Sequence, residues 1–146
     1  MRRVSYLPYL VLALLFALSA CREDKTVPIH DVRVHFTGVT LDGLGAYVIA
    51  QSRNVEDGTL MLLHSESPNS SFFRTVDFKI PEDQEFVVTV NLLNVKGAAT
   101  LPRGTAILAS ILVDGLEKQA RLDFETPPTN APYKTSQAVV LPSEWP

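Results

Sequence analysis

The sequence of 146 residues contains a single cysteine, Cys21, and therefore cannot form an internal disulfide. Whatever fold it adopts must be held by its hydrophobic core and its hydrogen bonds. The length suits one domain and is sufficient to bury a substantial core. The sequence thus predicts a single domain without covalent cross-links.

Motifs for catalysis and for phosphate binding are also absent, since neither Gly-x-Ser-x-Gly, nor a phosphate-binding glycine loop, nor His-Glu-x-x-His occurs. Of the three histidines, His30 and His35 have opposite parity along one expected strand and would point to opposite faces. His64 belongs to a different segment. Zinc sites normally need three or four ligands. We therefore predict no enzyme, no catalytic residues, no metal and no cofactor.

Clusters of basic residues are missing as well. Acidic residues outnumber basic ones, 16 to 13, and charges of both signs are interspersed along the chain. Nucleic-acid-binding surfaces need clustered Lys and Arg. The pattern indicates a solvated, mildly acidic surface and predicts no nucleic acid partner.

The first twenty residues have three parts in a fixed order. Met1–Arg3 carries two arginines, Leu7–Leu18 is almost wholly apolar, and the small pair Ser19–Ala20 precedes Cys21. This layout is typical of a secretory signal peptide. The apolar run has about 12 residues, whereas a helix that spans a bilayer needs about 20. Residues 1–20 are therefore expected to form a cleaved signal helix.

The residues Leu18, Ser19, Ala20 and Cys21 together resemble the lipobox of bacterial lipoproteins. The resemblance implies that the first three are recognised by the signal peptidase. It also implies that Cys21 receives a diacylglycerol thioether and that the new amino terminus is acylated, with acyl chains such as palmitate. Acylation would remove the reactive thiol of an unpaired exported cysteine. Two or more acyl chains give stable anchoring, at about 0.8 kcal/mol per buried methylene.

The residue after the cysteine is Arg22, where enterobacterial lipoproteins retained at the inner membrane carry Asp. The resemblance thus implies the outer membrane, with the domain facing the periplasm. Residues 21–29 read as a short polar tether, and the eight residues from 22 to 29 reach at most about 26–29 Å when extended. Residues 30–146 are then expected to form the domain, close to the headgroups.

Apolar residues recur with a period of two from Asp31 onward, which is the signal of a β-strand. No stretch after Cys21 has sustained helical periodicity. The segments expected to form strands are 32–37, 46–51, 60–64, 72–80, 86–93, 107–113, 116–122 and 138–141. Seven or eight short strands of this kind predict an all-β fold, a single immunoglobulin-like or transthyretin-like β-sandwich.

One hairpin is predicted in full register. The pair Asp114–Gly115 favours a two-residue type I′ turn. A slip of one residue would turn the apolar face outward. The pairs expected on the buried face are Val113–Leu116, Ile111–Lys118, Ala109–Ala120 and Ile107–Leu122, and those on the other face are Leu112–Glu117, Ser110–Gln119 and Leu108–Arg121.

Three residues are candidates for a partner surface. Leu108 and Leu112 lie on the less apolar face of the hairpin, and Trp145 is near the end of the chain; each could instead pack on the domain itself. These features predict a membrane-anchored, non-catalytic lipoprotein of the cell envelope that docks or assembles with a protein partner. The alternative is a ligand-binding or inhibitory envelope lipoprotein, which would use an apolar pocket or the loops 65–71 and 98–104.

Overall fold

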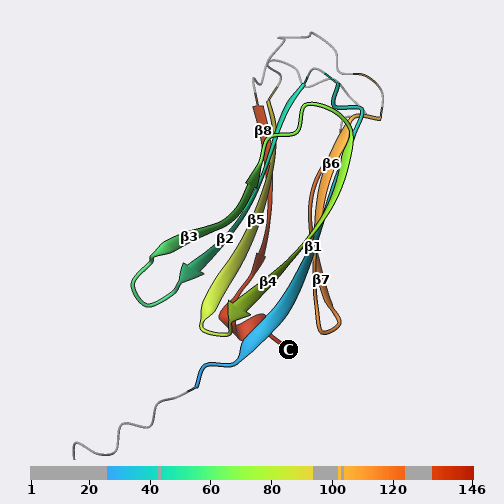
Figure 1. The fold of residues 1–146 in the computed structure, drawn as a ribbon. Helices are drawn as coiled ribbons and strands as arrows, with labels where there is room; N and C mark the ends of the chain where they lie inside the picture. The colour runs from blue at the N-terminus through green and yellow to red at the C-terminus, as the bar shows by residue number, and fades with distance from the viewer. Residues whose placement is uncertain (1–25, 43, 94–101, 103, 124–132) are drawn as a thin grey trace, which may run out of the picture.

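The computed structural model describes residues 26–42, 44–93, 102, 104–123 and 133–146. These residues form eight β-strands in two antiparallel sheets of four strands, packed face to face as a sandwich (Figure 1). Within this part of the chain the one helical element is the 3-10 turn η1 (Pro142–Glu144). The prediction of an all-β sandwich of seven or eight strands is confirmed, whereas the signal helix lies outside the described residues.

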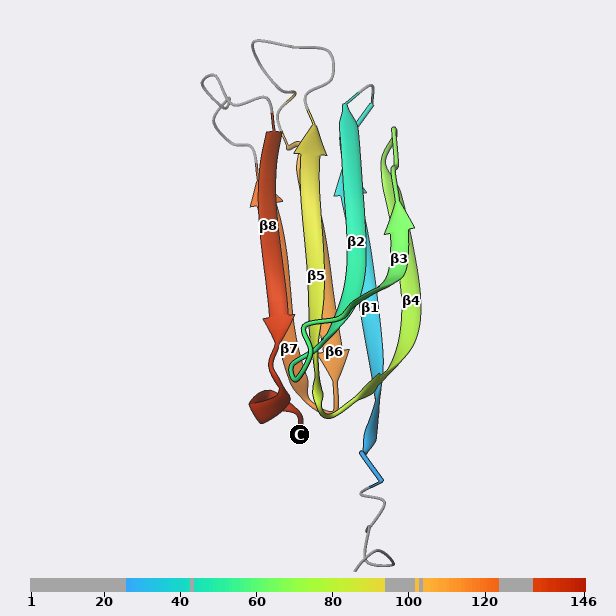
Figure 2. The same cartoon turned by 90° about the vertical axis from the view of Figure 1, so that its left-hand side faces the viewer.

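Each sheet brings together strands that are far apart in the sequence (Figure 2). β1 pairs with β4 and β6, whereas the first strand of an immunoglobulin constant domain pairs with the second. The likeness to immunoglobulin domains is therefore one of architecture. In spatial order, sheet A consists of β4 (Phe72–Pro81), β1 (Ile29–Val39), β6 (Ala106–Val113) and β7 (Leu116–Asp123), and sheet B of β3 (Leu60–Glu66), β2 (Gly45–Asn54), β5 (Gln84–Leu93) and β8 (Tyr133–Val140).

The core lies between the sheets and is built from every second residue of the inner strands, as the period of two predicts. β5 lies between β2 and β8, as expected for a strand that is apolar on both faces. Burying each large aliphatic or aromatic side chain contributes about 1.5–3 kcal/mol. The largest fully buried side chains are Phe36, Phe86, Leu41, Ile80, Ile107, Ile111, Val32, Val34, Val48, Val88, Val90 and Val140.

The β6–β7 hairpin forms in the predicted register, and all seven expected pairs are present. Asp114 has a φ of 40° and Gly115 a φ of 89°. A type I′ turn requires positive φ at both central residues, and Asp and Gly tolerate it better than other residue types. This local chemistry explains why the register could be read from two residues.

The chain enters the sandwich at one end, which we call the tether end (Figures 1 and 2). β1 begins at Ile29, directly after the short segment Thr26–Pro28. The carbonyl oxygen of Pro28 accepts a hydrogen bond of 2.9 Å from the backbone N–H of Glu82, in the β4–β5 connection. The β6–β7 turn and η1 lie at the same end. The position of the chain at Pro28, where it enters β1, is therefore fixed by backbone pairing.

Candidate docking surface

A bulge interrupts the pairing of β3 with β2. Ala50 lies opposite His64 but Gln51 lies opposite Leu62, so Leu63 has no residue facing it. An extra residue of this kind bends the strand and increases its twist. Beyond the bulge the hairpin turns out of the plane of sheet B and projects from the sandwich (Figure 1).

The projecting part, Val55–Leu62, is named here the hairpin tip, and both of its faces are in solvent. Leu60, Met61 and Leu62 are 57–59% exposed although consecutive strand residues point to opposite faces. Val55, in the turn, is 50% exposed. In β1, by contrast, every second side chain is buried. The tip therefore presents large apolar side chains that the domain itself does not cover.

The turn of this hairpin is well defined. The Asn54 side-chain oxygen accepts a hydrogen bond from the N–H of Glu56, and Asp57 accepts one from the N–H of Thr59, both at 2.8 Å. The Thr59 hydrogen bonds also hold the pKa of Asp57 below its ordinary value. Gly58 supplies the positive φ, 72°. The tip is thus a specific hairpin that holds its apolar residues in fixed positions.

The other half of β3 is fastened to the sandwich. Leu63 packs against the core, and the ring of His64 stacks on Phe36 with 5.5 Å between the centroids. The carboxylate of Glu66 lies 3.8 Å from His64 Nε2 and 3.4 Å from Arg74 Nε. These contacts hold the base of the strand while its tip projects.

The outer edge of β3 carries no strand within the described sheets. From Leu60 to Ser65 it also carries no Asp, Glu, Lys or Arg. Natural proteins usually place charges, especially Lys, on such edges to prevent pairing with other chains. The other edge strands follow this rule: β4 contains Arg74, Asp77 and Lys79, β7 contains Glu117, Lys118 and Arg121, and β8 contains Lys134.

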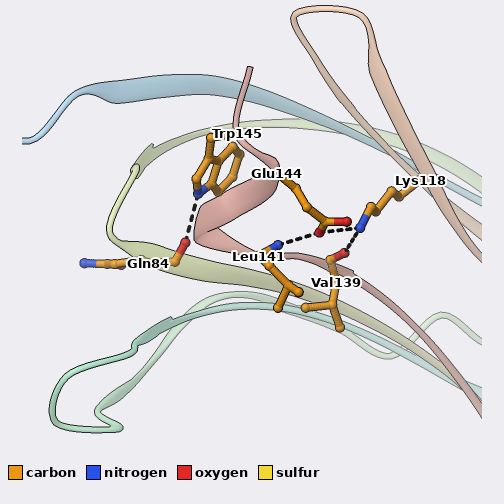
Figure 3. Close-up of polar contacts among 6 residues, drawn as sticks. All are labelled: Gln84, Lys118, Val139, Leu141, Glu144 and Trp145. Carbon is orange, nitrogen blue, oxygen red and sulfur yellow. Dashed lines mark hydrogen bonds and ion pairs between the residues drawn. The ribbon is translucent and has the colours of Figure 1, made fainter.

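The edge of β8 is covered by specific contacts from its neighbours (Figure 3). Lys118 of β7 donates a hydrogen bond of 2.7 Å from Nζ to the carbonyl oxygen of Val139 and forms an ion pair with Glu144. Glu144 also accepts a hydrogen bond of 2.8 Å from the N–H of Leu141. The hydrogen bond from Lys118, and to a lesser extent that from the Leu141 N–H, holds the pKa of the Glu144 carboxyl below its ordinary value. A lysine from the opposite sheet thus closes this edge.

Trp145 is only 9% exposed and covers the tether end of the core. Its Nε1 donates a hydrogen bond of 3.0 Å to the carbonyl oxygen of Gln84, and its ring stacks on His30 at 4.9 Å. Of the two alternatives for Trp145, the structure places it on the domain itself. As it stands, the indole offers little surface to a partner.

Leu108 and Leu112 lie half-buried on the outer face of sheet A. That face is polar, and its charges are satisfied by one another; the Arg33 guanidinium, for example, holds the pKa of Asp77 below its ordinary value. The two leucines are therefore set in a solvated face, apart from the apolar tip. The contacts between β1 and β4 on this face are Arg33–Asp77 (2.8 Å), Lys79–Asp31 (2.7 Å) and His35–Thr75 (2.8 Å).

His30 and His35 point to opposite faces, as predicted: His30 is buried and His35 lies on the outer face of sheet A. In the described part of the chain, no three His, Cys, Asp or Glu side chains gather closely enough to hold a metal ion. No described helix has the length and the apolar character needed to cross a bilayer. The lipobox residues Leu18, Ser19, Ala20 and Cys21 lie outside the described residues.

A shallow depression of about 520 Å³ lies on the outer face of sheet B, between the hairpin and the C-terminal turn. The charged groups beside it form ion pairs with one another, so the depression favours an uncharged occupant. The loops 65–71 and 98–104 do not line it among the described residues. Its lining residues are Gln51, Arg53, Leu60, Glu85, Val87, Lys118, Gln137, Val139, Leu141 and Glu144.

No protein family, curated protein or solved structure matches this chain. Sequence reasoning did not single out the hairpin tip, although Leu60, Met61 and Leu62 are a signal that could have been used. Three consecutive large apolar residues directly after the Asp57–Gly58 turn break the alternation expected of a half-buried strand.

Proposed function

We propose that this chain is a non-catalytic lipoprotein, held by the lipid on Cys21 at the periplasmic face of the outer membrane, that docks a partner protein on the free edge of β3. The observation that carries the proposal is that this edge strand lacks both a pairing strand and a charged side chain from Leu60 to Ser65. Unprotected edges accept an added strand from another chain.

The edge also indicates the chemistry of the partner segment. Backbone N–H and C=O groups along β3 would pair with an extended segment, which supplies affinity without regard to sequence. Side chains directly opposite one another in a sheet interact and provide specificity. Because Leu60 and Leu62 share one face of β3, the partner segment is expected to be uncharged, with apolar or β-branched residues at alternate positions.

A photo-crosslinking experiment in cells tests the proposal. A photoreactive residue is placed at Leu62 on β3, or at Thr75 on the edge strand β4 as the matched control; both positions are exposed. We expect one discrete cross-linked protein from position 62 and none from position 75. Equal products from both positions, or none from either, would contradict docking on β3.

The depression on sheet B favours a second candidate function, the binding of a small uncharged ligand by the envelope lipoprotein. Its apolar lining includes Val87 and Val139 beside Leu60 and Leu141. Ligand sites are concave and combine apolar side chains with a few polar groups, and this shallow depression offers four apolar residues among polar ones. A Val87→Trp variant would fill it, so binding of an apolar fluorescent probe to the purified domain should fall. Probe binding that is unchanged in Val87→Trp would rule this site out.

A further inference from the structure

Exposed apolar side chains are distributed unevenly over the described part of the molecule. Seven of the nine large exposed hydrophobic residues lie in the half of the sandwich at which the chain enters (Figure 1). Val39 and Phe73 are the two at the opposite end. The seven, named here the tether-end cluster, are Val27, Ile29, Val55, Leu60, Met61, Leu62 and Leu141.

We propose that the tether-end cluster, through Val55 and Met61 of the hairpin tip, rests on the bilayer surface that holds the lipid of Cys21. The domain would then have two membrane contacts, the covalent lipid and the hairpin tip, and the second would fix how the domain is oriented. This inference rests on the lipid-anchoring part of the proposed function. It commits to lipid as the occupant because the cluster lies in the half of the sandwich at which the chain from Cys21 enters the domain.

The length of the tether makes such a contact effective. The chain from Cys21 to Ile29 reaches at most about 26–29 Å when fully extended. Linking one contact to another converts the second into an intramolecular event with a high effective concentration. A few apolar side chains that would bind vesicles weakly from solution are thereby sufficient when the domain is already anchored.

The charge at this end indicates what kind of lipid contact it is. The turns near the cluster carry acidic residues, so an anionic surface would repel them. The contact must therefore come from insertion of apolar side chains among the headgroups rather than from charge, and it should be insensitive to salt. The acidic residues in these turns are Glu56, Asp57, Glu82, Asp83 and Asp114.

Membrane contact through Val55 and Met61 leaves the docking edge accessible, because Met61 points away from the face of β3 that Leu60 and Leu62 share. A strand rises about 3.3 Å per residue, so Glu66 lies roughly 20 Å along β3 from Leu60. With Val55 and Met61 at the surface, the half of β3 that is fastened to the sandwich stands clear of the headgroups. The contact would thus present the free edge to partners in a fixed orientation above the membrane.

The test uses the full chain purified from membranes, with the lipid on Cys21 verified by mass. Single cysteines, Val55→Cys or Met61→Cys, receive a polarity-sensitive fluorophore, and the matched controls are Val39→Cys and Phe73→Cys, which are similarly exposed at the opposite end. The thioether blocks the sulfur of Cys21, so the new thiol is labelled alone. The proteins are reconstituted into phosphatidylcholine vesicles that contain nitroxide-labelled lipid.

Labels at positions 55 and 61 are expected to shift to the blue and to be quenched about two-fold or more relative to positions 39 and 73, equally at low and high salt. Met61→Asp should abolish the shift at position 55, whereas Phe73→Asp should not. Equal quenching at all four positions, or loss of the shift in high salt, would overturn the proposed contact while leaving the anchor intact. Absence of lipid on Cys21 would show instead that the anchor fails, and the inference would fall with it.

Discussion

The two edge strands of sheet B, β8 and β3, differ in whether side chains from elsewhere in the domain contact their outer edge. β8 is contacted on its outer side by Lys118 and Glu144, whereas β3 carries no charged side chain from Leu60 to Ser65 and projects beyond a bulge at Leu63. The same domain therefore protects one edge with specific contacts and leaves the other open. Because unprotected edges promote aggregation, the difference locates the surface that a partner is expected to cover.

The largest expected effect on stability comes from a substitution in the C-terminal turn, which follows the covered edge strand β8. Trp145→Ala removes the ring that covers His30 and holds the C-terminal turn to Gln84, and should lower the free energy of unfolding by about 3 kcal/mol. Met61→Ala, in the exposed tip, should change it by no more than about 0.5 kcal/mol. Urea unfolding of both variants measures this contrast. Comparable losses of stability in the two variants would mean that Met61 is packed as tightly as Trp145.

A smaller loss is expected from the lysine that closes β8. Lys118→Ala leaves the Val139 carbonyl and the Glu144 carboxylate without their shared donor, and should cost about 1–2 kcal/mol. The control is Lys79→Ala, which removes an exposed ion pair with Asp31 and should cost less than about 0.5 kcal/mol. If both substitutions have the same effect, Lys118 is an ordinary surface lysine.

The pH dependence of stability is a second test of the contact between Lys118 and Glu144. The pKa of Glu144 is lowered by Lys118 and Leu141, so folding favours its deprotonated form. This stability is present above the unfolded pKa, about 4.3, and is lost as the pH falls through the lower folded pKa. The urea midpoints of the wild type and Glu144→Gln should differ between pH 5 and pH 7 and approach each other as the pH falls below the unfolded pKa of about 4.3. A difference that persists in acid would contradict this account.

The smallest effect on stability is expected from a substitution on the free edge of β3. Leu62→Lys places a charge on the free edge of β3 and should change the free energy of unfolding by less than about 0.5 kcal/mol, because Leu62 is exposed. It should nevertheless abolish the cross-link to a partner formed from a neighbouring position such as Ser65. Thr75→Lys on β4 is the matched control and should leave the cross-link unchanged.

The sequence predicted those parts of the fold that depend on local chemistry. Asp114 and Gly115 determined a turn, the turn determined a register, and the apolar alternation determined which face is buried. Each of these inferences needed only residues that are close in the sequence.

The candidate site depended on contacts that no local pattern contains. Residues 60–64 were expected to form a strand and do, but the bulge arises from how β3 pairs with β2. The tail after Leu141 forms η1 and places Trp145 on His30, more than a hundred residues earlier in the chain. Exposure of the tip and burial of the tail both follow from tertiary packing.

The position of β1 has a mechanical consequence. β1 is central in sheet A, pairing with β4 on one side and β6 on the other, and the tether leaves along its axis from Ile29. Antiparallel hydrogen bonds run perpendicular to the strands. A pull on a lipid attached to the tether would therefore load both ladders in shear, many bonds at once, rather than peel them apart one by one. The proposed tether would thus join the domain through a strand that is paired on both sides.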